Sequence, residues 1–563
     1  MSSEQRTELF ASVFEERAEN LSWRELESWT TYTPREQHVV RKLRGPGAKL
    51  VTGPRGSGKS TLLKTAYFQS LSAKDALPVY VNYAKSLALE PLFHKRADAL
   101  QLFRQWVLWK IVDGLSASFR EAKEDMPLEL TRLVPDVAKI IRAYETGRVP
   151  EVLPSIAPSE VIELLEVCAQ KFGAERCVVL MDDAAHAFSQ EQQREFFEVF
   201  RELRSRRVAC KAAVYPGVTS YSPNMHVGHE AELLEAWSLP DEDNYLEGMR
   251  SLVERRLPPA YSNSLRDKQE LVDYLALAAF GLPRAFLNML ADVFDVDADE
   301  SPRPTRLKAE RAVASQAQEV RGVFAALARK LPRYATFVSM GGELERALIR
   351  TVSTFNALQG VAIRKAKVVA IEQPIEPALQ KLLNLLEYAG LVRPSGAVSR
   401  GVKGRFSRYT IHYALLLSEN ALRLGKSVAM QETVRVLRGR NPHAFARAKS
   451  AKLLGSGYSE RCTLDLPPCQ NCGAARISEE QKFCMRCGQE LSEASIYAEL
   501  LHAPISVLAL PEKKLQGIAE GSSLETVQDI LLDDELQQLR KVRGIGPVWA
   551  RKIRTAAEEF AGV

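Results

Sequence analysis

The sequence predicts a multidomain α/β protein, and three observations support this prediction. The chain has 563 residues, which at about 100–200 residues per domain suggests three to five domains. Short apolar runs alternate with helical patterns in the first half, as expected for buried parallel strands flanked by helices. These runs are residues 49–52, 77–83, 177–181 and 208–215. A glycine-rich loop separates the first run from a helical pattern at 60–70, so we expect a parallel sheet flanked by helices.

The rest of the chain is divided by composition and motif. Between 301 and 455, a helical pattern at 376–389 precedes two strand-like segments separated by glycines, which fits a winged helix. A helical bundle with one hairpin would give the same pattern. The predicted units are a helical segment at 1–45, the α/β core at 46–240, a helical lid at 241–300, a helical or winged-helix domain at 301–455, a cysteine-rich unit at 460–495 and a small helical unit at 500–563.

Composition and charge exclude several classes of protein. Hydrophobic residues make up 46% and charged residues 26%, so a collagen, a mostly disordered chain and a disulfide miniprotein are excluded. The most apolar stretch, 271–294, is interrupted by charges and by a Gly-Leu-Pro turn, and the N-terminus lacks the apolar core of a secretory signal. The eight cysteines lie in a pattern that favours metal over disulfides. We therefore expect no membrane contact and a reducing, cytoplasmic location.

The net charge of +6 is modest, but it is unevenly distributed. Residues 401–460 contain eleven Lys or Arg against three Glu, and residues 536–557 contain six basic residues and no acidic one. Such runs are most often solvated faces, and a nucleic-acid contact is the alternative.

The glycine-rich loop matches the P-loop pattern G-x-x-x-x-G-K-[ST] in the required position between a strand and a helix. Its backbone N–H groups would cradle the phosphates of ATP, Lys59 would add a point charge, and Ser60 would complete the shell of a Mg²⁺ ion. The predicted nucleotide-binding residues are Gly53, Pro54, Arg55, Gly56, Ser57, Gly58, Lys59, Ser60 and Thr61.

A second half of this site follows the apolar run that begins at Cys177. Asp182 and Asp183 lie where this strand reaches the carboxyl edge of the sheet, the edge at which α/β sheets bind ligands. We expect Asp182 to hold Mg²⁺ and Asp183 to orient the attacking water in ATP hydrolysis. The alternative role for Asp183 is to cap the following helix.

Residues of about 30–300 resemble AAA+ ATPases of the origin-recognition and initiator type, including compact bacterial relatives. The resemblance depends on three separated motifs, at 53–64, 211–221 and 281–287. It implies that Thr219 is the polar sensor residue and that Arg284 in the lid reaches the γ-phosphate. The asparagine usual at the sensor position is absent, and the acidic pair is Asp-Asp rather than Asp-Glu. Because of these departures, the resemblance does not imply rapid ATP hydrolysis or assembly into a ring. For Arg284, the alternative is an exposed helix arginine.

Two C-x-x-C-G motifs predict a tetrahedral Zn²⁺ site. The ligands would be Cys469, Cys472, Cys484 and Cys487, with eleven residues between Cys472 and Cys484. A unit of about 25 residues is too small to be stabilised by a hydrophobic core alone, so metal binding would contribute to its free energy of folding. The unit resembles zinc ribbons, and the alternative is four buried free cysteines.

The last unit contains a Gly-Ile-Gly turn at 544–546 between two helical patterns, which looks like a helix-hairpin-helix. Such a turn presents backbone N–H groups to a phosphate of DNA. Over 505–560 the unit resembles the C-terminal domain of the RNA polymerase α subunit, which binds DNA and also contacts proteins. A protein-interaction module is the alternative. The predicted DNA contacts are Arg543, Gly544, Gly546, Arg551 and Lys552.

The sequence therefore favours an ATP-hydrolysing switch that binds duplex DNA, with roles in replication, recombination, mobile elements or anti-phage defence all open. The second hypothesis is a slowly hydrolysing scaffold or signalling switch whose zinc ribbon and C-terminal unit bind a protein partner. Homo-oligomerisation is compatible with both hypotheses.

Overall fold

The first half of the chain is built on a five-stranded sheet in which every pair of neighbouring strands is parallel. The strands are β1 (Lys49–Thr52), β2 (Leu77–Asn82), β3 (Cys177–Asp182), β4 (Val208–Val214) and β5 (Glu232–Glu235). Their order is β2-β3-β4-β1-β5, so β4 lies between β1 and β3. The sequence pattern predicted the first four strands and missed β5, because this edge strand is short and two of its four residues, Leu233 and Glu235, are exposed.

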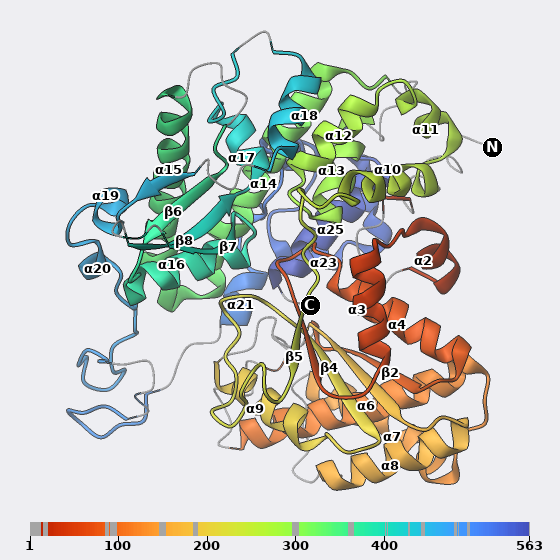
Figure 1. Ribbon diagram of the computed structural model, residues 1–563. Helices are drawn as coiled ribbons and strands as arrows, with labels where there is room; N and C mark the ends of the chain where they lie inside the picture. The colour runs from red at the N-terminus through yellow and green to blue at the C-terminus, as the bar shows by residue number, and fades with distance from the viewer. Residues whose placement is uncertain are drawn as a thin grey trace.

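Both faces of this sheet are covered by helices (Figure 1). Alternate residues of each strand point to opposite faces, so Leu50 and Val179 join one apolar cluster while Val51 and Val178 join the other. The first cluster includes residues of α6 (Ala99–Ala122), α7 (Leu128–Glu145), α8 (Pro158–Phe172) and α9 (Gln190–Glu202). The second includes residues of α3 (Pro34–Arg44) and α4 (Lys59–Ala73), and α2 (Trp23–Trp29) packs beside α4.

The predicted lid and the region after it share one continuous hydrophobic core. The lid helices are α10 (Tyr245–Arg256), α11 (Pro259–Leu265), α12 (Gln269–Ala278) and α13 (Pro283–Phe294). These helices pack on α14 (Arg306–Lys330) and α18 (Met430–Arg438). Three further helices lie between α14 and α18 in the chain, namely α15 (Ala335–Leu358), α16 (Pro377–Tyr388) and α17 (Tyr413–Ser418). The predicted boundary near residue 300 therefore does not separate two cores, because α13 packs directly on α14.

A second sheet has the order β7-β8-β6-β9. Its strands are β6 (Val368–Glu372), β7 (Val392–Ser399), β8 (Arg405–Ile411) and β9 (Ala446–Ala448), and α16 lies between β6 and β7 in the chain. A helix followed by an antiparallel β7–β8 hairpin is the arrangement from which we predicted a winged helix. The winged-helix assignment itself stays a prediction.

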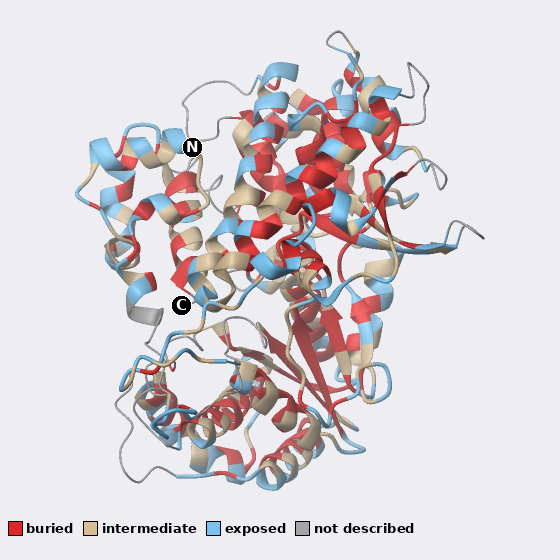
Figure 2. Ribbon diagram, turned by 90° about the vertical axis from the view of Figure 1, so that its left-hand side faces the viewer, coloured by how far each residue is buried: buried red, intermediate tan, exposed pale blue. Residues whose placement is uncertain are grey.

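The C-terminal unit has a small core of its own, which includes Trp549 and Ile553. Its helices are α21 (Ile496–Leu501), α22 (Glu512–Gly521), α23 (Val527–Leu532), α24 (Gln537–Lys541) and α25 (Pro547–Ala561). The cysteine-rich unit precedes it, after α19 (Ser450–Leu454) and α20 (Tyr458–Arg461). Figure 1 shows α23 and α25 in the centre of the view, and Figure 2 shows buried residues concentrated in the strands and on the inward-facing sides of the helices.

This computed structural model describes residues 13–561 except for 15–17, 19–20, 85–88, 90–97, 146–153, 184–189, 295–302, 359–364, 400, 402–403, 426–427, 441–444, 478–480, 482 and 492–495. Within these ranges, no helix combines the length and the apolar character needed to cross a membrane.

Candidate functional site

The P-loop is open toward a ligand at the start of α4. Gly58 has a left-handed conformation (φ +89°), and a Cβ atom added there would meet nothing within 4 Å. The helix begins at Lys59 without a side-chain cap, so the N–H groups of its first turn have no acceptor within the helix. An uncapped helix N-terminus beside open space is suited to bind phosphate oxygens.

Lys59 is buried in this loop, with only 6% of the residue exposed. Its Nζ donates to the backbone oxygens of Gly53 at 2.7 Å and Pro54 at 3.1 Å, and it lies 3.9 Å from the centre of the Tyr215 ring. Burial lowers the pKa of Lys59 to about 7, although Asp183 and Asp182 favour its charged form. A phosphate group near this amine would offset the cost of burying its charge.

Ser57 supplies a further test of whether a nucleotide fits the loop. Its hydroxyl is buried, and no described residue forms a hydrogen bond with it. A buried hydroxyl without a protein partner is costly, and a phosphate oxygen would satisfy it. Together with the uncapped helix and the buried amine, this hydroxyl makes the loop fit the phosphates of ATP.

The acidic pair ends β3 at the carboxyl edge of the sheet, beside β4. Asp182 is almost completely buried, and its two carboxylate oxygens accept hydrogen bonds from the Tyr80 hydroxyl at 2.7 Å and from the backbone N–H of Asp183 at 3.0 Å. Carboxylate oxygens are ligands that Mg²⁺ prefers, so Asp182 is suited to hold Mg²⁺ through water. Asp183 has a left-handed conformation (φ 50°), which aspartate tolerates better than most residues.

Tyr215 is a site residue that sequence reasoning missed. It follows β4 directly, and its hydroxyl donates to Asp183 Oδ1 at 3.0 Å while its ring lies under the Lys59 amine. Burial and the nearby Asp183 raise the pKa of Tyr215 well above its ordinary value, so the hydroxyl keeps its proton and acts as a donor. A tyrosine in an apolar strand pattern gives no signal of its own, because core tyrosines are common.

Thr219, by contrast, is occupied within its own turn. Its hydroxyl donates to the backbone oxygen of Tyr215 at 2.7 Å and accepts from the Tyr215 N–H at 3.1 Å. The predicted sensor role for Thr219 does not fit this geometry, because both bonds close the turn after β4. The side chain that reaches the acidic pair from this strand is Tyr215.

Arg284 does lie beside the P-loop. A Cβ atom added to Gly56 would come within 3.1 Å of the Arg284 Cβ, so the lid arginine crosses directly over the loop. Its Nη1 atom, however, pairs with Glu559 of the C-terminal helix α25 at 2.5 Å. Arg55 of the loop lies 3.6 Å from the same carboxylate. The alternative of an exposed helix arginine is therefore wrong.

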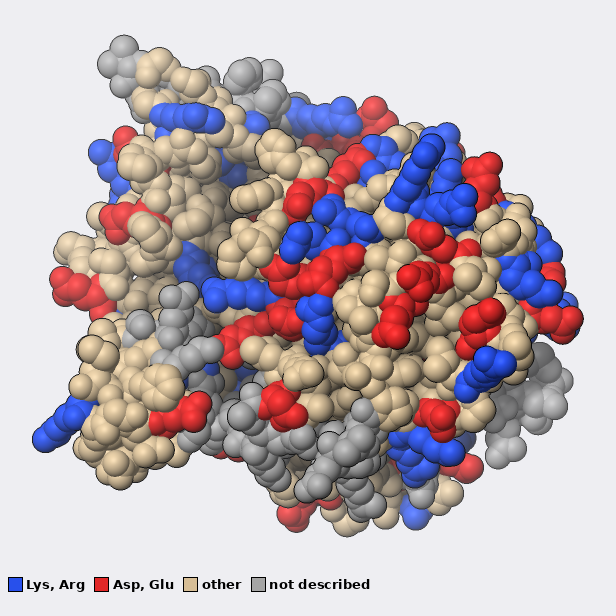
Figure 3. Space-filling view, turned by 90° about the horizontal axis from the view of Figure 1, so that it is seen from below, with Lys and Arg blue, Asp and Glu red and all other residues tan. Residues whose placement is uncertain are grey.

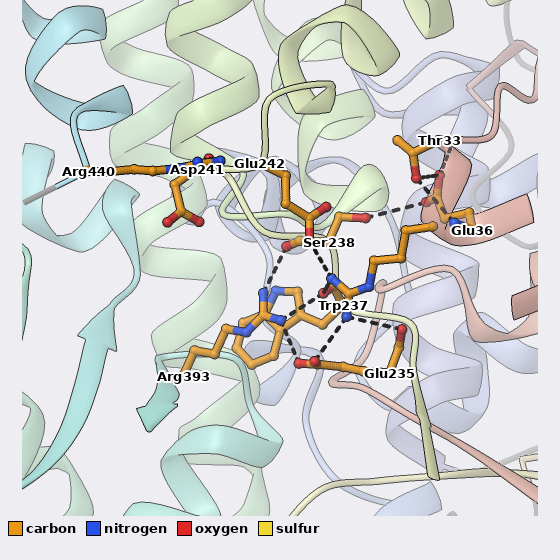
Figure 4. A network of polar contacts seen from close by, with 10 residues as sticks. Thr33, Glu36, Glu235, Trp237, Ser238, Asp241, Glu242, Arg393 and Arg440 are labelled. Atoms are coloured by element: carbon orange, nitrogen blue, oxygen red, sulfur yellow. Dashed lines mark hydrogen bonds and ion pairs between the residues drawn. The ribbon is translucent and has the colours of Figure 1, made fainter. Parts of the chain in front are cut away.

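The linker between core and lid, residues 235–242, is held from two sides (Figure 4). Arg35 of α3 pairs with Glu235 at 3.0 Å and with Glu242 at 2.7 Å. Arg393 of β7 is buried, donates to the backbone oxygens of Ser238 at 3.0 Å and Trp237 at 2.9 Å, and pairs with Glu235 at 2.5 Å. Residues of α3 and of β7 therefore both bind the linker that connects the core to the lid.

The four predicted zinc ligands are brought together. All four sulfur atoms lie within 4.8 Å of one another, with Cys469 and Cys487 3.6 Å apart and Cys472 and Cys484 3.5 Å apart. Neighbouring sulfurs in a tetrahedral site with Zn–S bonds of about 2.3 Å lie about 3.8 Å apart. The donor set and its spacing therefore fit one Zn²⁺ ion.

The two cysteine turns repeat the same backbone hydrogen bonds. Gly473 N–H donates to the oxygen of Cys469 at 2.8 Å, and Gly488 N–H donates to the oxygen of Cys484 at 2.9 Å. Both glycines have positive φ values, 68° and 72°, which a left-handed turn requires. Backbone N–H groups of Cys487 and Arg486 lower the pKa of Cys484, which favours the thiolate that binds metal.

The structure divides the predicted DNA contacts of the C-terminal unit into two groups. Arg543, Gly544 and Arg551 are exposed around the turn between α24 and α25, and Gly544 has a φ of 81°. Gly546 is half-buried at the start of α25. Lys552 lies on the inner side, with 12% of its side chain exposed and its Nζ 3.7 Å from Glu319 of α14.

Comparisons with known proteins give only distant likenesses. No protein-family model matches the sequence, and no curated protein matches it. A Walker-type ATPase of Pyrococcus abyssi is 15% identical, with a TM-score of 0.38 over 73% of this chain and 99% of that one. Cdc6p from Pyrobaculum aerophilum is 13% identical (TM-score 0.30, 73% and 97%), and the Orc1 protein of Aeropyrum pernix, solved in complex with DNA, is 14% identical (TM-score 0.27, 69% and 92%). Likenesses at this level assign no activity.

Proposed function

We propose that this chain is an AAA+ ATPase that binds and hydrolyses ATP and that attaches to duplex DNA through its C-terminal units. The observation that carries the proposal is the arrangement of the buried Lys59 and the Asp182–Asp183 pair at one edge of a parallel sheet. Short strand-to-loop transitions place the amine and the carboxylates there, and Tyr215 links them by contacting both.

Each residue has a definite role in this proposal. The N–H groups at the start of α4, the Ser57 hydroxyl and the Lys59 amine would hold the phosphates of ATP. The Ser60 hydroxyl and Asp182 would hold Mg²⁺, which lowers the charge on the transferred phosphate. Asp183, oriented by the Tyr215 hydroxyl, would accept a hydrogen bond from the attacking water.

The basic residues around the last turn support the DNA part of the proposal. Arg540, Lys541, Arg543 and Arg551 are all exposed there, so their charges are available to phosphates. The face of the molecule seen in Figure 3 carries basic and acidic side chains interspersed, so a broad basic surface does not form on that face. On that face, DNA attachment would depend on small local sites.

One observation favours the alternative, a scaffold that binds protein. The cysteine-rich unit exposes three large apolar side chains, Ile477 by 79%, Phe483 by 57% and Met485 by 82%. Exposed apolar groups on a small metal-stabilised unit are suited to contact a protein surface. A scaffold of this kind would bind ATP but would not respond to DNA.

An ATPase assay on the full chain with and without duplex DNA tests the proposal. We expect Mg²⁺-dependent hydrolysis that DNA changes, and loss of this activity in Lys59→Ala with at least about a tenfold loss of ATP affinity. Lys42→Ala, which removes a lysine of α3 that pairs with Glu232 at the other end of the sheet, is the matched control. Unchanged ATP affinity in Lys59→Ala would exclude the nucleotide site.

A further inference from the structure

The last helix of the chain lies against the nucleotide site. Glu559 of α25 places one carboxylate oxygen 2.5 Å from Arg284 of the lid and the other 3.6 Å from Arg55 of the P-loop. The Glu559 backbone oxygen also accepts a hydrogen bond from Lys330 of α14. One residue of the C-terminal unit thus joins the loop, the lid and α14.

The two arginines that hold Glu559 are cations of the phosphate site. All three side chains are mostly buried, with 19% of Arg55, 25% of Arg284 and 22% of Glu559 exposed. Although burial opposes its charge, the Glu559 carboxylate raises the pKa of Arg55. A carboxylate that neutralises these cations competes with any other anion placed beside them, because like charges at short range repel each other.

We propose that the C-terminal unit, residues 500–561, is a latch that ATP releases: Glu559 holds the unit on Arg55 and Arg284, and the γ-phosphate of ATP displaces it. This inference rests on the proposed ATP site. When the triphosphate enters, its negative charge takes over the two arginines and repels the Glu559 carboxylate. The contact between α25 and the P-loop is then lost.

Release would also change the DNA-binding surface. Lys552 now faces Glu319 of α14, and its Nζ lies 4.6 Å from the centre of the Trp549 ring. When α25 leaves α14, Lys552 becomes accessible beside the exposed Arg551, one residue earlier in the helix. ATP would therefore raise DNA affinity, and by reciprocity DNA would raise ATP affinity by the same factor.

The contact region is built so that the unit can leave as a whole. The C-terminal unit keeps a core of its own, including Ile553 and Trp549, so its detachment does not require unfolding. A cavity lies between α25 and the site, lined by both arginines, Lys330 and Glu559 among other residues. An interface that contains a cavity and charged groups holds less tightly than a packed apolar one.

The first experiment compares Glu559→Gln with Glu558→Gln in the full chain. Glu558 pairs with Arg554 of its own helix at 2.9 Å, so it is a matched control on the same helix. We expect Glu559→Gln to bind a fluorescent ATP analogue about fivefold or more tightly than the parent and to bind duplex DNA more tightly without nucleotide. Equal affinities in the parent and both variants would overturn the latch.

The second experiment detects the docked unit directly. A Cβ atom added to Gly322 of α14 lies 2.9 Å from the Ala509 Cβ, closer than the approximately 3.5–4.5 Å of disulfides, so the two segments must move apart by about 0.6 Å or more to accept one. After this small shift, Gly322→Cys with Ala509→Cys should form a disulfide under mild oxidation, read by mass spectrometry of the linked peptides. We expect ATP with Mg²⁺ to slow this reaction several-fold, and we expect ADP, which lacks the γ-phosphate, to slow it less.

The outcomes separate the latch from the proposed function. If the parent binds no ATP, the nucleotide site itself fails. If the parent binds ATP while the disulfide forms equally fast with and without it, the latch is overturned and the ATP site stands. Cross-linking that ATP slows in the parent but not in the same cysteine pair carrying Lys59→Ala supports both.

Discussion

Lys59 shows how one buried side chain can couple ligand binding to proton uptake. Its pKa is lowered to about 7 by burial, so the amine is partly neutral near physiological pH. The charged groups facing it are Asp182, Asp183, Arg55 and Arg284. Between pH 7 and 10.5 the folded chain holds fewer protons at this site than the unfolded chain, so the lysine's contribution to stability becomes more favourable as pH rises through that window.

A bound triphosphate would raise this pKa again, because it favours the charged amine. We expect ATP binding at pH 8 to take up about 0.5 to 1 proton per site. Titration calorimetry in two buffers of different ionisation enthalpy measures this number. Lys59→Arg, which keeps its charge at pH 8, should abolish the buffer dependence; an unchanged dependence in this variant would assign the proton to another group.

Asp183 and the hydrogen bond that it accepts from Tyr215 should affect ATP hydrolysis much more than ATP binding. Asp183→Asn should leave ATP affinity within about threefold of the parent and slow hydrolysis by about 10²–10⁴-fold. Tyr215→Phe removes only the donor hydroxyl, so we expect a smaller loss of about 3- to 10-fold in kcat. Single-turnover hydrolysis with separate binding measurements checks both. Equal rates in the parent and Asp183→Asn would leave Asp183 as a structural residue.

At the scale of the element, the cysteine-rich unit shows why two short turns need a metal. Each turn is closed by its own backbone hydrogen bonds, and the residues between the turns include the exposed Ile477. Among the described residues of the unit, Cys469 and Cys484 are the buried side chains that join the two turns. The four sulfurs therefore take the place of an apolar core.

We expect one Zn²⁺ per chain, measurable by elemental analysis of protein purified without chelator. Cys469→Ser should abolish zinc binding and the hydrogen-exchange protection of the two cysteine turns, residues 469–474 and 484–489, while ATP affinity stays unchanged because the core sheet lies in a separate cluster. Cys462→Ser, which lies outside the four-sulfur cluster, is the control. Zinc retained in Cys469→Ser would contradict the site.

At the scale of the whole molecule, DNA binding would be shared by two basic regions. One is the exposed set around the last turn, and the other includes Arg438, Arg447 and Lys452, which are exposed in the region 430–452. Two weak attachments on one chain reinforce each other, because the second forms at high effective concentration.

We expect the affinity for duplex DNA to fall steeply with salt, with a slope of about −0.9 per phosphate neutralised. Arg543→Gln with Arg551→Gln should weaken binding and reduce the slope by about two, and adding Arg438→Gln should reduce both further. Lys139→Gln, at a lysine whose side chain is 80% exposed on α7, is the control. Anisotropy at two salt concentrations gives both quantities, and equal slopes in all chains would favour the scaffold.

Local motifs allowed the sequence to predict much of the site. The P-loop residues are consecutive, and two residues separate the cysteines of each pair, so local backbone geometry fixes their relative places. Asp182 was predicted from the apolar strand that ends at it. The edge strand β5 was missed because it has only four residues with a glutamate at each end, so it lacks the apolar run that predicted the other strands. Tyr215 was missed because its role depends on β4 lying beside β3, which no local pattern encodes.

The contact of Glu559 with Arg284 spans 275 residues of sequence and joins two separately folded units. Such a contact depends on how complete surfaces fit together, and a single glutamate in a helical pattern looks like any solvated charge. The position of Lys552 could not be predicted from sequence for the same reason. The run of basic residues around it suggested an exposed face, but its side chain pairs with Glu319 in the interface with α14.

The hydrogen bonds from Arg393 to the core–lid linker would couple movement of the second sheet to movement of the lid. Because this arginine belongs to β7, a rotation of the lid that keeps its bonds to Trp237 and Ser238 must carry the second sheet along as a rigid arm. The linker is then the pivot, and displacement grows in proportion to distance from it. The described strand ends Ser399 and Arg405 lie farther along the hairpin from the linker than Arg393, so they would move through a larger arc than Arg393 itself, and a small closure at the phosphates would be magnified there.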